Sequence, residues 1–280
     1  MRIVTLFVCL FLTSPLVAEE IRIQGGQPYA QPKNPRRMLD IYAPTKGKNH
    51  PVVLWIHGGG WRKGDKASVR KKPQAFVDKG FVFVATNYRF VPNVTVEEMT
   101  GDIAKAIKWI HDHAKEFGGD GDSIFVMGHS AGAHLAALVC TDDSYLKAEG
   151  LSLSIIKGCV PVDVGVYDIS RRLEAEGKPA SKTFTQVFGK SQESYKNLSP
   201  VTHVAKGKNI PAFLILHVAD RAVTKDQSHW FADKLKKAGI AARVVAAEGT
   251  THGTINANLG LPNDRPTQEM WKFLNEILKK

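Results

Sequence analysis

The chain has 280 residues, 43% of them hydrophobic, and its 38 Lys and Arg against 27 Asp and Glu give a formal net charge of +11. This composition is ample for a large core, and no internal repeat, low-complexity tract or linker divides the chain, so we expect one globular domain. The lysines are scattered rather than interleaved with aromatic residues, which excludes a nucleic-acid-binding platform and favours a solvated basic surface with some affinity for acidic polymers.

Residues 1–18 differ in kind from the rest of the chain. Arg2 precedes the apolar run Ile3–Leu12, and the small residue Ala18 comes just before two glutamates. This pattern predicts a cleaved signal peptide, a mature domain of residues 19–280 and a secreted or periplasmic location. An uncleaved N-terminal anchor is the alternative, but the apolar run is short for a membrane-spanning helix, so we expect no stable membrane insertion.

Apolar strand-like runs alternate with helix-like segments along the rest of the chain. In chain order we expect a strand at Arg37–Tyr42, a strand at Pro51–Ile56, a helix at Lys66–Lys79, a strand at Phe81–Asn87, a helix at Thr95–Phe117, a strand at Ser123–Met127, a helix at Ala133–Val139, strands at Ile155–Pro161 and Ala212–His217, a helix at Lys225–Ala238, a strand at Arg243–Ala247 and a helix at Pro266–Leu278. This alternation predicts an α/β fold with a mostly parallel central sheet and helices on both faces. The polar interval at about 166–209 breaks the rhythm, and we interpret it as a small lid-like excursion.

The segment Gly128–Gly132 reads Gly-His-Ser-Ala-Gly and lies between an expected strand and an expected helix. Glycines are needed there because a turn this sharp brings neighbouring side chains into collision with strand and helix. Such a turn exposes the Ser130 hydroxyl as a nucleophile and lets the Ala131 N–H face a developing oxyanion. A solvated serine on an ordinary strand–helix turn is the alternative.

A second glycine motif, His57-Gly-Gly-Gly-Trp61, follows the expected strand Pro51–Ile56. Three successive glycines allow the backbone N–H groups of Gly59 and Gly60 to point at a ligand, and acyl transfer needs such donors at the carbonyl oxygen. Trp61 either lines the substrate-binding pocket or packs beside the loop.

With these motifs the sequence resembles the α/β-hydrolase superfamily, specifically esterases with a His-Gly-Gly-Gly oxyanion loop and, within them, the feruloyl-esterase-like and arylformamidase-like branch. The likeness runs from about Arg37 to the C-terminus. The stretches that carry it are His57–Trp61, Asn87–Arg89, Gly128–Leu135 and Leu216–Asp220. It implies an α/β-hydrolase fold and a Ser-Asp-His triad in that chain order. Neither a cofactor nor a metal is expected.

A serine nucleophile needs a base, and the base needs an orienting carboxylate. His252 follows the last expected strand in a glycine-flanked loop, and we predict that it is the base. Asp220 ends the strand before it and is the predicted acid. Two alternatives remain for the carboxylate: Asp220 caps the next helix, or Asp163, after the preceding strand, is the acid.

Other residues are expected to have structural roles. Asn87-Tyr88-Arg89 is interpreted as a buried hydrogen-bonding brace for neighbouring loops, and His134 as a packed neutral histidine. Cys140 and Cys159 lie in core-like contexts, so two buried thiols are favoured, although an exported protein also permits a disulfide between them.

The sequence therefore predicts a secreted serine esterase for short or aryl acyl groups, with catalytic Ser130, Asp220 and His252, acting on a small-molecule or polysaccharide-linked ester. An arylformamidase-type amide hydrolase and a catalytically silent binding protein of the same fold are the alternatives. No sequence feature indicates the oligomeric state.

Overall fold

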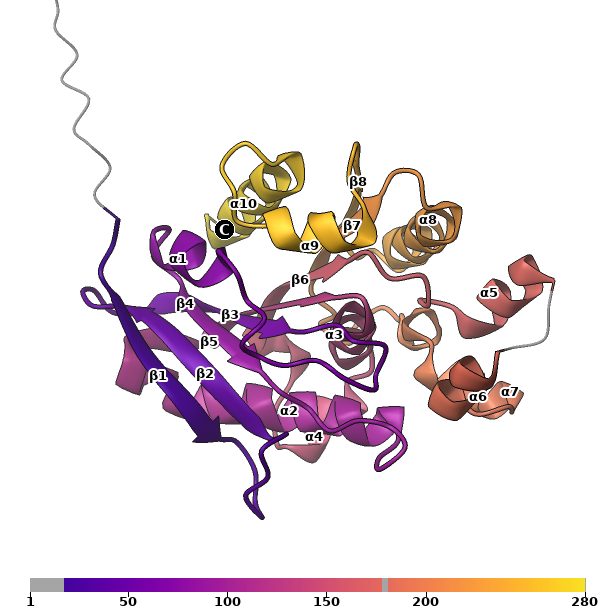
Figure 1. The fold of residues 1–280 in the computed structure, drawn as a ribbon, viewed down its shortest axis with the longest axis horizontal. Helices are drawn as coiled ribbons and strands as arrows, with labels where there is room; N and C mark the ends of the chain where they lie inside the picture. The colour runs from indigo at the N-terminus through magenta and orange to yellow at the C-terminus, as the bar shows by residue number, and fades with distance from the viewer. Residues whose placement is uncertain (1–17, 178–180, 280) are drawn as a thin grey trace, which may run out of the picture.

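A computed structural model describes residues 18–177 and 181–279, which fold around one eight-stranded sheet (Figure 1). The strands are β1 (Ile21–Pro28), β2 (Met38–Pro44), β3 (His50–Ile56), β4 (Val82–Thr86), β5 (Gly119–His129), β6 (Ile156–Val162), β7 (Ala212–Val218) and β8 (Ala242–Ala247). The helices are α1 (Lys72–Val77), α2 (Val96–His113), α3 (Ala131–Thr141), α4 (Ser144–Ala148), α5 (Ile169–Glu176), α6 (Lys182–Phe188), α7 (Gln192–Leu198), α8 (Ala222–Lys237), α9 (His252–Asn258) and α10 (Arg265–Leu278), with short 3-10 turns at Ala114–Phe117, Leu153–Ile155 and Pro200–His203. The predicted signal peptide lies, apart from Ala18, outside the described residues.

The strand order is β1-β2-β4-β3-β5-β6-β7-β8. β2 pairs antiparallel with both of its neighbours, and every pair from β4 to β8 is parallel, so β2 alone runs in the opposite direction. The predicted α/β-hydrolase fold with its mostly parallel sheet is confirmed. The parallel strands end at one edge, where their connecting loops meet.

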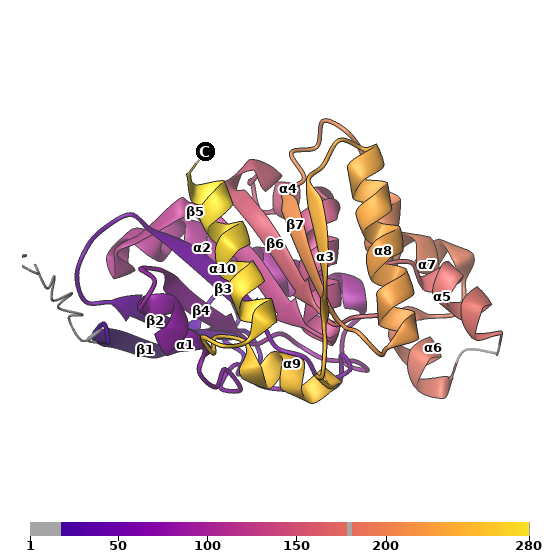
Figure 2. The same cartoon turned by 90° about the horizontal axis from the view of Figure 1, so that it is seen from above.

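Helices cover both faces of the sheet (Figure 2), and one hydrophobic layer of buried side chains lies on each face. Successive residues of a strand point to opposite faces, and in β3 the side chains of Val52, Leu54 and Ile56 join one layer while Val53 and Trp55 join the other. Helices α2, α3 and α8 pack on the first face, and α1, α9 and α10 on the second. The strands are therefore buried from both sides, as their continuous apolar runs predict.

Several elements differ from the expectation, among them β1, α1 and α9. β1 was not predicted because its Gly25-Gly26 pair interrupts the strand pattern, and the pairing with β2 shifts register there. The helix expected at Lys66–Lys79 is only Lys72–Val77, since a proline is tolerated in the first turn of a helix but not in its interior, and Pro73 therefore stands near the start of α1. The loop expected around His252 is the start of α9.

The interval between β6 and β7 forms the small helical excursion α5–α7, which extends to the right of the sheet in Figure 1. Phe188 and Tyr195 anchor it to the core. Its function as a lid stays a prediction. Cys140 and Cys159 are buried, unbridged thiols, in agreement with the interpretation favoured from the sequence.

Candidate active site

Ser130 occupies a strained turn between β5 and α3. Its backbone has φ 55° and ψ −122°, a conformation that L-residues adopt only when the surroundings impose it. The surrounding backbone leaves no room for a side chain at two positions of this turn. A Cβ at Gly128 would lie 2.3 Å from the Gly132 carbonyl oxygen, and a Cβ at Gly132 would lie 2.2 Å from the Ile56 carbonyl oxygen. The two glycines are therefore a steric requirement of the turn, as the sequence pattern predicts.

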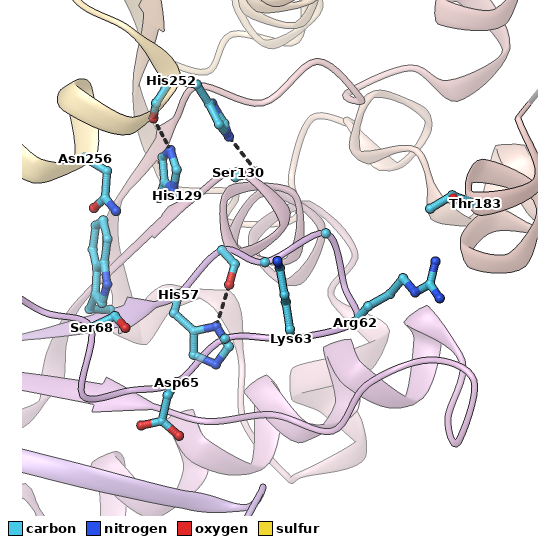
Figure 3. A pocket seen from close by; sticks show the side chains of 15 residues that line it. His57, Arg62, Lys63, Asp65, Ser68, His129, Ser130, Thr183, His252 and Asn256 are labelled. Carbon is cyan, nitrogen blue, oxygen red and sulfur yellow. Dashed lines mark hydrogen bonds between the residues drawn. The ribbon is translucent and has the colours of Figure 1, made fainter.

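His252 stands over the serine as the first residue of α9. Its Nε2 lies 3.0 Å from Ser130 Oγ, across 122 positions of sequence (Figure 3). The helix begins there because Thr251 and Thr254 form a reciprocal capping box. The structure thus brings the predicted nucleophile and the predicted base within hydrogen-bonding distance.

Two buried groups hold α9 in place from below. His129 Nε2 donates a hydrogen bond of 2.9 Å to the His252 carbonyl oxygen. Lys72 donates to the backbone and side-chain oxygens of Asn256, at 2.7 and 2.8 Å, and lies over the Trp55 ring. Burial lowers the pKa of His129 to about 4 and that of Lys72 to about 7. Neither group was recognised from the sequence.

The carboxylate bound to His252 belongs to Asp163, so the prediction that Asp220 fills this position is wrong. Asp163 Oδ2 lies 2.6 Å from His252 Nδ1. Since a carboxylate only accepts, Nδ1 carries the proton and Nε2 is left to accept one from Ser130. Asp220 is exposed on the turn before α8 and has no side-chain hydrogen bond within the described part of the chain; it is not the helix cap either, because Arg221 occupies that position.

The surroundings of Asp163 keep it ionised. Its side chain is buried, Oδ1 accepts a 3.0 Å hydrogen bond from the Val218 N–H, and Oδ2 also contacts Arg221 Nη1. Burial by itself raises the pKa of Asp163, but the hydrogen bonds from His252 and Val218 and the charge of Arg221 outweigh it, so this pKa lies well below its ordinary value. One sequence signal was available: Asp163 stands inside the apolar run Val162-Asp-Val164, and a carboxylate placed there is buried and needs partners.

The expected oxyanion donors lie next to the serine. Gly59 and Gly60 have φ of 135° and 62°, which places the loop in conformations that glycine adopts readily. On the other side, Ala133 and His134 donate the first bonds of α3 to the Ser130 carbonyl, so the N–H of Ala131 at the helix start precedes the intrahelical ladder. Gly59 and Gly60 line the same pocket as Ser130, and the role of these three N–H groups as oxyanion donors stays a prediction.

The segment Asn87-Tyr88-Arg89 braces the loops around the site, as predicted. Asn87 Oδ1 accepts from the Lys66 N–H at 2.7 Å. Tyr88 donates to the His57 carbonyl at 2.9 Å and stacks on the His57 ring. Arg89 pairs with Asp102 through two hydrogen bonds of 2.8 Å. The oxyanion loop is thereby tied to the β4 end of the sheet.

Trp61 contacts α3 and the excursion and does not line the pocket. Its indole N–H donates to His134 Nδ1 at 3.3 Å, and its ring packs edge-on against Phe188 of the excursion. His134 Nε2 in turn lies 2.8 Å from the Leu198 carbonyl oxygen. Because an indole only donates and a carbonyl only accepts, the His134 ring is neutral with its proton on Nε2. Of the two roles considered for Trp61, this placement favours packing beside the loop over substrate binding.

A pocket of about 620 Å³ opens above Ser130 (Figure 3). It is lined by the oxyanion loop, by the residues that follow this loop, by Trp55, and by Asn256 and Thr183 of α6, which lie on opposite sides of it in Figure 3. Trp61 does not belong to its lining. No cluster of metal-ligating side chains occurs in residues 18–177 and 181–279, and no helix in these ranges is long and apolar enough to cross a membrane.

Residues 39–235, more than half of the chain, match the BD-FAE family. The chain belongs to this family. Among its relatives, a probable isoprenylcysteine alpha-carbonyl methylesterase of Arabidopsis thaliana is 28% identical over 86% of this chain and 52% of its own length. The probable carboxylic ester hydrolase LipM of Mycobacterium tuberculosis is 32% identical over 67% of this chain and 45% of its own length. The chain spans about half the length of these relatives.

Solved structures also resemble this BD-FAE family chain. A thermophilic esterase from Thermogutta terrifontis is 26% identical, with a TM-score of 0.68 and coverage of 94% of this chain and 92% of the other. The named relatives and this neighbour are carboxylic ester hydrolases and esterases.

Gly60 offers a clean test of the oxyanion loop. A Cβ at Gly59 would lie 1.9 Å from the Lys63 carbonyl oxygen, so alanine there disrupts the loop itself, whereas a Cβ at Gly60 meets nothing within 4 Å. We expect Gly60→Ala to retain the fold and to lower kcat by roughly 10²–10³-fold, because its positive φ disfavours alanine and turns the N–H away from the substrate. Steady-state kinetics measure this. Gly150→Ala is the matched control, since Gly150 also has positive φ and open space; equal activity of the two variants would show that the loop is only a turn.

His134 makes stability depend on pH. Burial lowers its pKa from 6.5 to about 4, so between these values the unfolded chain takes up a proton that the folded chain refuses. The free energy of unfolding therefore decreases as the pH falls from 6.5 towards 4, and His134 accounts for about 3 kcal/mol of this decrease. In His134→Gln, urea unfolding at pH 7 and pH 4.5 should show a smaller loss than in the wild type. Equal losses would contradict the neutral, buried state of His134.

Proposed function

We propose that this protein is a serine hydrolase that cleaves carboxylic esters through an acyl-enzyme. The observation that carries the proposal is the continuous chain from Ser130 Oγ through the His252 ring to Asp163, with contacts of 3.0 and 2.6 Å. Family membership and the esterase names of its relatives support the same chemistry.

In the proposed mechanism, Ser130 Oγ attacks the ester carbonyl carbon while His252 Nε2 takes the hydroxyl proton. The carbonyl oxygen becomes negatively charged and accepts hydrogen bonds from the N–H groups of Gly59, Gly60 and Ala131. Collapse of this intermediate releases the alcohol, which takes the proton back from His252. A water molecule then repeats the sequence on the acyl-enzyme. Asp163 keeps the imidazole oriented and stabilises its charged form, and it does not itself take up the proton.

A fluorophosphonate label tests the proposal directly. The wild type should be labelled on Ser130, as located by peptide mass spectrometry, whereas Ser130→Ala and unfolded protein should not be labelled. A folded wild type that resists labelling would support the catalytically silent binding protein instead.

The pocket predicts the substrate size. Trp55 is the only large apolar side chain among the described residues that line it, and β1 at the sheet edge contributes nothing to its wall. Long acyl chains gain about 0.8 kcal/mol per methylene only where apolar walls remove the chain from water. We therefore expect kcat/KM to be highest for acetyl to butyryl esters, with aryl esters accepted and long chains poor.

A panel of acetyl, butyryl, octanoyl, palmitoyl and feruloyl esters, together with formylkynurenine, measures this preference. A kcat/KM that rises from butyryl to palmitoyl would contradict the open pocket. Preference for formylkynurenine would favour the arylformamidase alternative.

We also propose that the enzyme is exported. Support comes from the sequence, in which Arg2, the apolar run Ile3–Leu12 and Ala18 have the order of a cleaved signal peptide. N-terminal sequencing of the mature protein should begin at Glu19, and a mature chain that begins at Met1 would contradict export by this route.

A further inference from the structure

Two positively charged side chains line the pocket directly after the oxyanion loop. Arg62 and Lys63 are exposed, and Figure 3 shows them on the loop that passes below Ser130, with Arg62 directed to the side of the pocket where Thr183 lies. Their backbone N–H groups both donate to the Gly59 carbonyl oxygen at 3.2 Å. The turn that contains Gly59 therefore also fixes the backbone positions from which the Arg62 and Lys63 side chains extend.

Neither cation is neutralised by the protein. Within residues 18–177 and 181–279, Arg62 and Lys63 have no side-chain hydrogen bond and no ion pair. Other basic residues near the loop are engaged: Arg36 contacts Asp65 and the Gly64 carbonyl, Lys66 pairs with Asp40 at 2.6 Å, and Lys72 is buried against Asn256. Arg62 and Lys63 are the only Lys or Arg residues among the described residues that line the pocket, and both are without a partner there.

The carboxylate in the pocket lining does not offset them. Asp65 is the only acidic residue among the described lining residues. It accepts hydrogen bonds from the Ala67 N–H at 2.9 Å and from Asn87 Nδ2 at 3.2 Å, and it lies 3.5 Å from Arg36 Nη1. Burial acts to raise the pKa of Asp65, but these hydrogen bonds outweigh it and the pKa is lowered. Asp65 is therefore an ionised structural group with its own partners, and the pocket keeps a positive field.

We propose that the natural substrate is an ester that carries a carboxylate on the same molecule, and that Arg62 and Lys63 bind this carboxylate while the ester carbonyl lies in the oxyanion hole. This rests on the proposed esterase function. A guanidinium binds a carboxylate through two parallel hydrogen bonds, and an ammonium adds a mobile second charge. Exposed ion pairs are weak because water screens them, so the two cations together should favour a charged over a neutral ester by about tenfold, or ~1.4 kcal/mol.

The test compares esters that differ only by carboxylate against carboxamide. One pair, 4-acetoxybenzoate and 4-acetoxybenzamide, places the charge on the alcohol side of the ester, and the other, methyl hydrogen succinate and methyl succinamate, places it on the acyl side. The measured quantity is the ratio of kcat/KM for the carboxylate to that for the carboxamide. Comparing this ratio between variants cancels the intrinsic reactivity of each ester.

The variant is Arg62→Gln/Lys63→Gln, and the control is Lys236→Gln/Lys237→Gln, which removes the same two charges from the last turn of α8, outside the pocket lining. We expect the ratio to fall about tenfold in the first variant for at least one ester pair, mainly through KM, and to remain at the wild-type value in the control. In the wild type the ratio should also fall as salt rises from 0.05 to about 0.5 M, because exposed charges are screened.

Different outcomes separate the two proposals. Wild-type hydrolysis of the carboxamide esters with the same ratio in all three proteins would overturn the carboxylate subsite and leave the esterase function standing. An equal fall in both variants would also overturn it, because the effect would then come from net charge alone. A wild type that cleaves none of the four esters would overturn the proposed function, and the subsite with it.

Discussion

Replacement of Ser130 by alanine, or of His252 by alanine, should abolish ester hydrolysis to a similar residual level. Ser130 supplies the attacking oxygen and His252 the group that takes its proton, with only 3.0 Å between Oγ and Nε2. Because the two act as one unit, each single loss should be on the order of 10⁶-fold in kcat, and the double variant should lose little more. The measurement is steady-state hydrolysis of a 4-nitrophenyl acetate substrate.

Circular dichroism and thermal unfolding of both variants are the control, since the loss has meaning only in a folded protein. A Ser130→Ala variant with activity within tenfold of the wild type would contradict the nucleophile. A large difference between the two residual activities would contradict the assignment of a single shared step.

Asp163→Asn should reduce kcat by about 10³–10⁴-fold, whereas Asp220→Asn should leave it near the wild-type value. An asparagine at 163 can donate to His252 Nδ1, which would turn the imidazole to the tautomer whose Nε2 carries the proton and is unable to accept one from Ser130. Asp220 is exposed and contacts neither residue. Parallel kinetics on the two isosteric variants measure the difference.

The two aspartates control for each other, because each substitution removes one negative charge from the end of a neighbouring strand. Asp163 also accepts from Val218 and contacts Arg221, so near-ultraviolet circular dichroism must show that Asp163→Asn is folded. Loss of activity in Asp220→Asn with a fully active Asp163→Asn would restore the assignment made from the sequence.

Local patterns were sufficient to predict the sharp turn that carries Ser130. The turn at Ser130 needs glycine at two positions within five residues, because a Cβ at either would collide with backbone. Because this steric requirement involves only a few neighbouring residues, it can be recognised from a short sequence motif. The buried strands were predictable for a similar reason, since a strand covered on both faces is a continuous apolar run. The edge strand β1, exposed and interrupted by glycines, lacks that run and was missed.

The choice between the two aspartates depended on tertiary structure. Asp163 and Asp220 follow adjacent strands, and nothing in their spacing from His252 separates them. Burial distinguishes them in the folded chain. The Asp163 side chain is buried and contacts His252, which lies 89 positions further along the sequence, whereas Asp220 lies on an exposed turn. The packing of Trp61 also depends on tertiary contacts, which it makes with His134 and with Phe188 of the excursion.

The sequence by itself determined the fold class and singled out Ser130 and His252, whose side chains the structure brings to 3.0 Å from each other, because the fold class depends on apolar periodicity and the turn at Ser130 on steric limits within a few residues. Only the tertiary structure decided which carboxylate contacts His252, which residues Trp61 packs against, and that Arg62 and Lys63 have no partner among the described residues. These features depend on which side chains from distant segments of the chain contact each other and which remain without a partner. Burial and hydrogen bonding in the folded protein determine those contacts.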